Sequence, residues 1–202
     1  MRQHTELLVA TSNAGKVREL SHLLSGFPLR LRLLGEFSGV DEAEETGGTF
    51  EENAAIKALH YSAHSGLLTL SDDSGLSVDA LGGAPGVRSA RYAGREATYA
   101  ERMSKLIGEL DATGDAERRA RFVCVIAVAD PSAGTLHTFE GACEGRIARA
   151  PRGRGGFGYD PLFIPDGHDR TFGELPDEVK QTLSHRARAL ALAARHLRER
   201  YA

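Results

Sequence analysis

The amino-acid sequence predicts an α/β fold in which helices flank a mixed β-sheet. Apolar runs of strand length alternate along the chain with segments whose apolar residues recur at helical spacing. Residues 122–129 are almost all apolar, which is typical of a central strand covered on both faces. No repeat, linker or low-complexity tract interrupts this alternation, so we expect residues 1–202 to form one domain.

The expected strands are short apolar runs that end at turn-forming residues. In chain order they are residues 6–10, 29–34, 67–70, 122–129, 135–142 and 146–148. The third strand ends at two aspartates, just before the glycine turn that we expect over residues 72–75. Polar or glycine-rich stretches predict loops over 11–15, 35–48, 82–86 and 151–158.

The expected helices carry apolar residues three or four positions apart. They are residues 16–24, a segment from Thr49 to about Ser65, a segment that opens at Thr98, and residues 185–200. The second and third open with capping boxes, in which a threonine is followed three positions later by a glutamate. Ser184 is suited to cap the last helix.

Composition favours a soluble cytoplasmic protein. Hydrophobic residues make up 41% of the chain and charged residues 26%, which is ordinary for a globular domain. A net charge of −3 argues against a general nucleic-acid binder. The apolar stretch at residues 7–10 is too brief for a signal peptide, and no run reaches transmembrane length. The two cysteines show no metal-binding spacing, and Cys124 is expected in the core.

Asp72 and Asp73 are the most informative residues of the chain. Carboxylates at the end of a buried strand are costly unless a cation meets them there. In an intracellular chain that cation is commonly a divalent metal, and oxygen ligands with room for water suit Mg²⁺. A solvated turn explains one aspartate before Ser74 and Gly75. Because it explains two adjacent acids less well, the pair leaves both a metal or catalytic role and a turn open.

The polar turn at residues 11–15 is a candidate phosphate site. It lies where a strand ends and a helix begins, and Lys16 follows in the first helical turn. Free backbone N–H groups, small hydroxyls and a lysine at a helix N-terminus suit phosphate oxygens. The full Walker A pattern is missing. A capped helix with a surface lysine is the alternative.

The acidic loop before Thr49 and the helix after it carry further polar residues. Glu44 and Glu45 are either solvent-exposed or metal partners of the aspartates. Asn53 and Lys57 share one helix face with His60 and His64, for which a solvated face is expected.

Phe157 lies between glycines, so its ring is either tucked into the core or stacked on a planar ligand. Lys180, His185 and Arg186 place three donors around a helix start, although the dipole there prefers anions. An anionic or carbonyl-bearing ligand would resolve that mismatch.

Six segments in order along the chain resemble the inosine triphosphate pyrophosphatase family. They are residues 11–16, 44–53, 72–75, 82–92, 155–161 and 180–186. The resemblance covers nearly the whole chain, although Ser12 stands where many relatives have glycine. It implies Mg²⁺-dependent hydrolysis of ITP, dITP, XTP and dXTP to the monophosphate and pyrophosphate, usually by a homodimer. It also implies a long mixed sheet in two lobes around a central cleft.

The resemblance also implies a role for each matching residue. Asp73 would be the general base and a metal ligand, Glu45 the other metal ligand, with Asp72 and Asn53 in support. The phosphates would meet residues of the first turn, two helices and the turn after the aspartates: Thr11, Ser12, Asn13, Ala14, Gly15, Lys16, Lys57 and Ser74. Phe157 would stack on the purine. The base would be read or enclosed by Gly158, Tyr159, Asp160, Lys180, His185 and Arg186.

Two other functions remain open beside this one. A protein that binds nucleotides without hydrolysing them would keep the pocket. Loss of Asp73 or Glu45 would have indicated such a protein, but both residues are present. A kinase or phosphatase that uses the Lys16 turn would not release pyrophosphate. Within the pyrophosphatase interpretation, other modified nucleotides are the alternative substrates.

Overall fold

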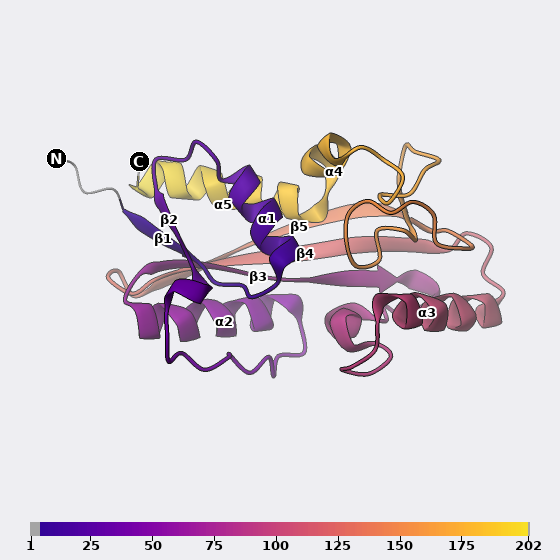
Figure 1. The fold of residues 1–202 in the computed structure, drawn as a ribbon, viewed down its shortest axis with the longest axis horizontal. Helices are drawn as coiled ribbons and strands as arrows, with labels where there is room; N and C mark the ends of the chain where they lie inside the picture. Colours follow the sequence, from indigo (N-terminus) through magenta and orange to yellow (C-terminus); the bar gives the residue numbers. More distant parts are fainter. Residues whose placement is uncertain (1–4, 202) are drawn as a thin grey trace. The chain divides into compact units, whose positions relative to one another are not determined.

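A computed structural model describes residues 5–201 of the chain (Figure 1). Within these residues six strands form one sheet in the order β2-β1-β3-β4-β5-β6. The strands are β1 Glu6–Val9, β2 Arg30–Leu33, β3 Leu68–Val78, β4 Arg119–Asp130, β5 Thr135–Ile147 and β6 Phe163–Pro165. The α-helices are α1 Ala14–Leu23, α2 Phe50–Ser65, α3 Tyr99–Thr113, α4 Asp177–Leu183 and α5 His185–Tyr201. Short 3₁₀ segments lie at Leu34–Glu36, Asp79–Leu81 and Gly86–Arg91.

The sheet is mixed, as the sequence predicts. β1 pairs in parallel with both β2 and β3, whereas β5 and β6 are antiparallel. The described chain divides into two compact units. The first holds residues 5–73, 124–141 and 186–201, and the second holds residues 74–123 and 142–185.

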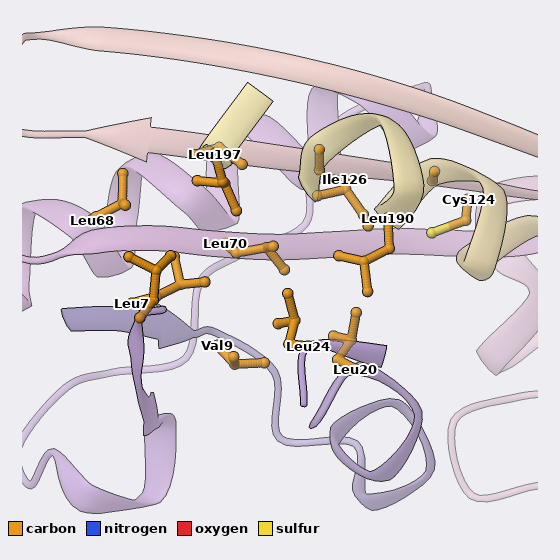
Figure 2. Close-up of a cluster of buried hydrophobic side chains, with 14 residues drawn as sticks. Leu7, Val9, Leu20, Leu24, Leu68, Leu70, Cys124, Ile126, Leu190 and Leu197 are labelled. Carbon is orange, nitrogen blue, oxygen red and sulfur yellow. The ribbon is translucent and has the colours of Figure 1, made fainter. Parts of the chain in front are cut away.

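In the first unit, helices cover both faces of the strands (Figure 1). On β4, Cys124, Ile126 and Val128 pack with α1 and α5, as Leu20 and Leu190 show (Figure 2). The alternate β4 residues, 125, 127 and 129, pack against Ala54 and Ala58 of α2. Because successive side chains of a strand point to opposite faces, this pattern confirms the predicted central strand and the core position of Cys124.

In the second unit, the core gathers around α3 and three phenylalanines. Leu106 and Leu110 of α3 are buried with Leu76 of β3. The Phe122 ring lies 4.6 Å from that of Phe163 and 4.8 Å from the nearly parallel ring of His185, measured between ring centroids. His185 is therefore held by an aromatic contact at the start of α5.

The turn predicted at residues 72–75 is wrong, because β3 runs through both aspartates to Val78. Their burial in a strand is compensated by the ion pairs described below. The predicted break between two strands after residue 142 is also wrong, because β5 is continuous. Gly145 fits this strand because a Cβ there would lie 2.3 Å from the carbonyl oxygen of Ile164 on β6.

The start of α1 and several short elements were not predicted from the sequence. The helix predicted from Lys16 begins at Ala14, because Asn13 caps it. β6, α4 and the 3₁₀ segments were not expected. Both predicted capping boxes are formed, at Thr49 and Thr98. No helix within residues 5–201 has the length and apolarity needed to cross a membrane.

Candidate active site

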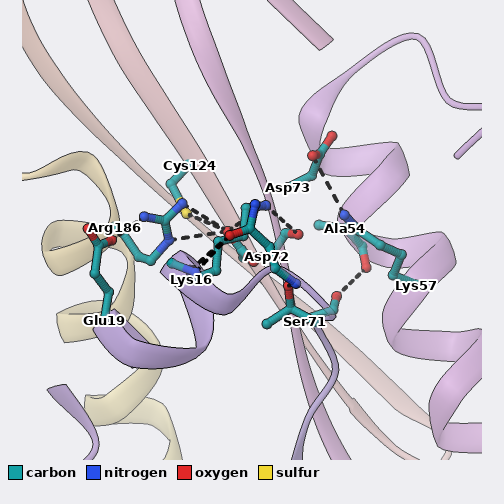
Figure 3. A network of polar contacts seen from close by, with 12 residues as sticks. Lys16, Glu19, Ala54, Lys57, Ser71, Asp72, Asp73, Cys124 and Arg186 are labelled. Atoms are coloured by element: carbon teal, nitrogen blue, oxygen red, sulfur yellow. Dashed lines mark hydrogen bonds and ion pairs between the residues drawn. The ribbon is translucent and has the colours of Figure 1, made fainter. Parts of the chain in front are cut away.

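Asp72 and Asp73 are consecutive residues of β3, so their side chains point to opposite faces of the sheet. Asp72 points toward α1 and α5, where it meets Lys16 and Arg186 (Figure 3). Asp73 points toward α2, where it meets Lys57 (Figure 3). The two aspartates thus serve two separate charge clusters in the first unit.

The Asp72 cluster is a buried ion-pair network. Asp72 Oδ2 lies 3.0 Å from Lys16 Nζ and 3.3 Å from Arg186 Nε and Nη2. Glu19 accepts a hydrogen bond from Nη1 of Arg186. The thiol of Cys124 lies 3.9 Å from the same Asp72 oxygen.

This network keeps Asp72 ionised. Burial alone would raise the pKa of Asp72, but the positive charges of Lys16, Arg186 and Lys57 outweigh it and hold the pKa well below its ordinary value. Asp72 therefore acts as a fixed negative charge that anchors Lys16. The Arg186 guanidinium is buried, and its Nε, Nη1 and Nη2 groups all contact acids of the first unit.

The Asp73 cluster is arranged around Lys57. Lys57 Nζ lies 2.5 Å from Glu45 Oε1 and 3.6 Å from Asp73 Oδ1. Burial raises the pKa of Asp73, against the lowering effect of Lys57 and Lys16. A carboxylate with raised proton affinity is better suited to accept a proton near neutral pH. The neighbouring acids Glu45 and Asp72 raise this pKa further.

The loop that carries Glu45 is held by α2. Asn53, fully buried in the first turn of α2, accepts a 2.8 Å hydrogen bond from the Gly47 amide. A Cβ at Gly47 would lie 2.6 Å from Glu52 Cβ and 2.8 Å from Asn53 Oδ1, so only glycine allows this close approach. Asn53 supports the site by fixing the loop two residues after Glu45. Of the two histidines predicted on a solvated face, His64 is exposed and His60 is half-buried.

Glu45 and Asp73 have the chemistry of a magnesium site. Both reach the same ammonium nitrogen, so their carboxylates already share one cation. Among residues 5–201, acids, histidines and cysteines form no metal-binding group of three or more. A pair of carboxylates nonetheless fits Mg²⁺, which is usually held by one or two carboxylates together with substrate phosphates and water.

The first turn differs in part from the predicted set of free amides. Asn13 Oδ1 accepts hydrogen bonds from the N–H groups of Gly15 and Lys16, at 2.9 and 3.2 Å. These two amides are occupied by the helix cap, as expected for an N-cap asparagine. Thr11, Ser12 and Ala14 complete the turn, and Ser12 and Ala14 are exposed.

The second unit holds an aromatic and ionic cluster. Lys180 Nζ lies 2.6 Å from Asp160 Oδ2 and 4.3 Å from the centre of the Phe157 ring. The same Asp160 oxygen accepts a 2.7 Å hydrogen bond from the Phe157 amide. Gly156 has φ +69°, and a Cβ there would lie 2.0 Å from Asp160 Oδ2, so glycine is required. Phe157 is half-buried rather than a core residue.

Two of the other predicted base contacts are core residues by their side chains. Tyr159 is buried, and its hydroxyl donates a 3.0 Å hydrogen bond to the Ser89 carbonyl. His185 is also buried and stacks on Phe122. Gly158 and Ser74 are half-buried. Tyr159 could therefore contact a ligand only through its main-chain atoms.

The model of the Ham1 family matches residues 7–196 of the chain. The chain belongs to the Ham1 family. A dITP/XTP pyrophosphatase of Desulforamulus reducens is 48% identical over 196 residues, which are 97% of this chain and 97% of the relative. One of Geobacter sulfurreducens is 50% identical and covers 96% of each chain. A solved Ham1 protein from Coxiella burnetii has a TM-score of 0.90 at 45% identity, over 96% of this chain and 99% of that one.

In this Ham1 family member, five residues predicted for phosphate and metal lie in the first unit, four of them on helices or a strand and Glu45 on a loop. Lys16, Lys57, Asp72, Asp73 and Glu45 form its two charge clusters. Sequence reasoning missed the partner of Arg186, Glu19. Its signal was its position three residues after Lys16, which places both on one face of α1.

Proposed function

We propose that this Ham1 family protein hydrolyses the triphosphates of deaminated purines, namely ITP, dITP, XTP and dXTP, to the monophosphate and pyrophosphate. By doing so it removes these nucleotides from the nucleotide pool. One observation carries the proposal: buried Asp73 shares Lys57 with Glu45. Relatives that are 48% and 50% identical to this chain and are named dITP/XTP pyrophosphatases also support it.

In this proposal the two lysines neutralise the triphosphate. A triphosphate carries about four negative charges, which Mg²⁺ and two or three cationic side chains would largely offset. Asp72 anchors Lys16, at 3.0 Å, so that the ammonium stays at the site without a substrate. Ser74 and the exposed residues Ser12 and Ala14 of the first turn would supply neutral donors beside these cations, because the helix cap occupies the Gly15 amide.

Asp73 takes the proton of the attacking water. The water oxygen forms a bond to the α-phosphorus, the bond from that phosphorus to the bridging oxygen breaks, and pyrophosphate leaves. The pKa of Asp73, raised by burial, makes this carboxylate a stronger base than an exposed aspartate. Glu45 and Asp73 would hold Mg²⁺, which supplies charge stabilisation for the phosphate oxygens.

Phe157 stacks on the purine in this proposal, and Lys180, with His185 and Arg186, provides donors for the base edge. Hypoxanthine and xanthine carry an acceptor at position 6, where adenine carries an amino donor. A buried donor that faces an amino group is left unpaired, and sites of this kind reject the wrong partner by up to ~10⁴-fold. ATP is therefore expected to be a very poor substrate.

We also propose a homodimer that works in the cytoplasm and binds no nucleic acid. The resemblance, which implies a homodimer, extends over 97% of the chain. Light scattering on the purified chain would report the mass of the assembly. A monomeric mass across the working concentration range would contradict the homodimer.

Hydrolysis of a nucleotide panel with Mg²⁺, with separate detection of pyrophosphate and orthophosphate, tests the proposed function. Pyrophosphate from ITP and XTP is the expected product. Orthophosphate instead would indicate a phosphatase, and binding without product would indicate a nucleotide-binding protein. Comparable kcat/KM values for ATP and ITP at saturating Mg²⁺ would contradict the base recognition even if pyrophosphate formed.

A further inference from the structure

Lys57 occupies the position where two carboxylates converge. Its Nζ lies 2.5 Å from Glu45 Oε1 and 3.6 Å from Asp73 Oδ1, while its side chain is only 12% exposed. The Asp73 side chain is 10% exposed and that of Glu45 32%. The ammonium group is therefore enclosed beside the acids rather than extended into solvent.

The other lysine of the site is held differently. Lys16 has a comparable exposure of 13%, but its Nζ contacts Asp72, which lies on the opposite side of β3 from Asp73 (Figure 3). Asp72 is also paired with Arg186. The ammonium of Lys16 is thus part of a network with two basic groups, whereas Lys57 bridges two acids.

Two carboxylates brought together in a partly buried site repel each other unless a cation lies between them. An ammonium and a divalent metal are both attracted to the same carboxylate oxygens, and they cannot occupy one position together. The structure thus shows a monovalent cation at the place where the chemistry of Glu45 and Asp73 suits Mg²⁺.

We propose that Lys57 holds the metal position between Glu45 and Asp73 in the substrate-free protein and leaves it when a divalent metal binds. The displaced ammonium then becomes available to an anionic ligand. This second step rests on the proposed function, with the triphosphate as the ligand, whereas the competition with metal does not. Lys57 is in this view a positioning residue before substrate binds and a phosphate ligand afterwards.

The proposal predicts opposite effects of one substitution on two ligands. Lys57→Met removes the competing charge and keeps most of the aliphatic stem, so metal should bind more tightly without nucleotide. The same change removes a cation from the triphosphate, so KM for ITP should rise. If Lys57 served only to bind phosphate, far from the metal position, its substitution would raise KM for ITP and leave metal affinity unchanged.

Binding of Mn²⁺ to the chain of residues 1–202 without nucleotide, followed by electron paramagnetic resonance of the free ion, measures the first effect. Lys57→Met should tighten Mn²⁺ binding roughly tenfold, because one positive charge in contact with the ligand oxygens is removed. Lys16→Met is the matched control, since it removes the same charge at similar burial without touching Glu45 or Asp73. It should tighten binding by about threefold or less.

Two further variants identify the metal site and provide a replacement if Lys57→Met does not fold. Glu45→Gln with Asp73→Asn, added to Lys57→Met, should abolish the tight Mn²⁺ binding. Thermal unfolding shows whether each variant is folded, and Lys57→Gln replaces Lys57→Met if the latter is not.

Unchanged or weaker Mn²⁺ binding in folded Lys57→Met would overturn the proposal, and so would equal gains in Lys57→Met and Lys16→Met. Product analysis keeps this separate from the proposed function. Tighter Mn²⁺ binding by a protein that releases no pyrophosphate would support the competition and reject the activity.

Discussion

The charge clusters of the first unit and the aromatic cluster of the second unit are built on different kinds of structure. Lys16, Lys57, Asp72 and Asp73 lie on two helices and a central strand, and each side chain is held by at least one ion pair. Phe157 lies in a glycine-rich turn, where its amide donates a hydrogen bond to the Asp160 carboxylate and its carbonyl accepts one from the Asp160 amide. The groups proposed to act on phosphate thus lie on regular elements, and the ring proposed for base stacking lies on a loop.

This difference assigns separate consequences to the two clusters. Substitutions of the acids and lysines in the charge clusters should change stability or turnover alike for every nucleotide. Substitutions in the second unit should change affinity and the choice of base.

Loss of the Asp72 charge should give the largest effect. Asp72→Ala leaves Lys16 and Arg186 beside each other without their shared carboxylate, and breaking a buried ion pair in this way costs roughly 3–5 kcal/mol. Denaturant unfolding at neutral pH measures the loss. Because the folded-state pKa of Asp72 is depressed, its stabilisation is present above the unfolded pKa and is lost as pH falls below it.

The acid-induced loss of stability should therefore be shallower in Asp72→Ala than in the parent protein. An equally steep loss, together with a stability change below about 1 kcal/mol, would contradict the buried network. Glu44→Ala, which removes an exposed acid from the Glu45 loop, is the control for a general charge effect.

Asp73→Asn should lower kcat by at least ~10²-fold, because the general base is lost and the metal is misplaced. Nucleotide binding should weaken far less, since both lysines remain. Steady-state kinetics with ITP separate the two effects. Turnover near the parent rate would mean that another group accepts the proton.

Phe157→Ala should raise KM by an amount that corresponds to ~1–3 kcal/mol of lost base stacking. ITP and XTP should be affected similarly, because stacking does not depend on the substituents of the base edge. Phe157→Tyr is the matched variant that keeps an aromatic ring. An unchanged KM in Phe157→Ala would show that the ring serves the fold and not the ligand.

The smallest expected effect lies away from both clusters, where His196 of α5 packs against His137 of β5. Their ring centroids are 4.3 Å apart, and burial, followed by His137 and Arg200, lowers the pKa of His196 while Glu199 opposes this. A histidine whose folded-state pKa is depressed resists protonation. Stability should therefore fall as pH drops below about 6.5, the unfolded value.

His196→Phe, which keeps a ring against β5, should reduce that pH dependence between neutral pH and the acid range. Chemical unfolding at several pH values gives the slope, and kcat at neutral pH should be unaffected. A slope identical to that of the parent would show that protonation of His196 is not linked to folding.

The sequence predicted the chemistry of the site better than its backbone. Paired acids at Asp72 and Asp73 pointed to a cation, and the structure places lysines beside both. The same acids suggested a turn, since aspartate and glycine are poor strand residues when considered locally. Tertiary ion pairs reversed that local preference, and such pairs cannot be derived from neighbours in the sequence.

The partners of Arg186 were missed for the same reason. Its position at the start of a helix suggested an external anion, but the structure shows that Asp72 and Glu19 already meet its guanidinium. β6 was missed because a three-residue strand carries too little pattern to be detected. Long elements with capping boxes, such as α2 and α3, were predicted well because their signals are local.

The ratio of kcat/KM for ITP to that for ATP tests whether the two clusters have separate roles. It should be measured side by side in Asp73→Asn and Lys180→Met. We expect Asp73→Asn to lower both values by the same factor and to keep the ratio of the parent protein. Lys180→Met removes the cation that lies 4.3 Å from the Phe157 ring, so the ratio should fall. A ratio that collapses in Asp73→Asn and is retained in Lys180→Met would contradict the account.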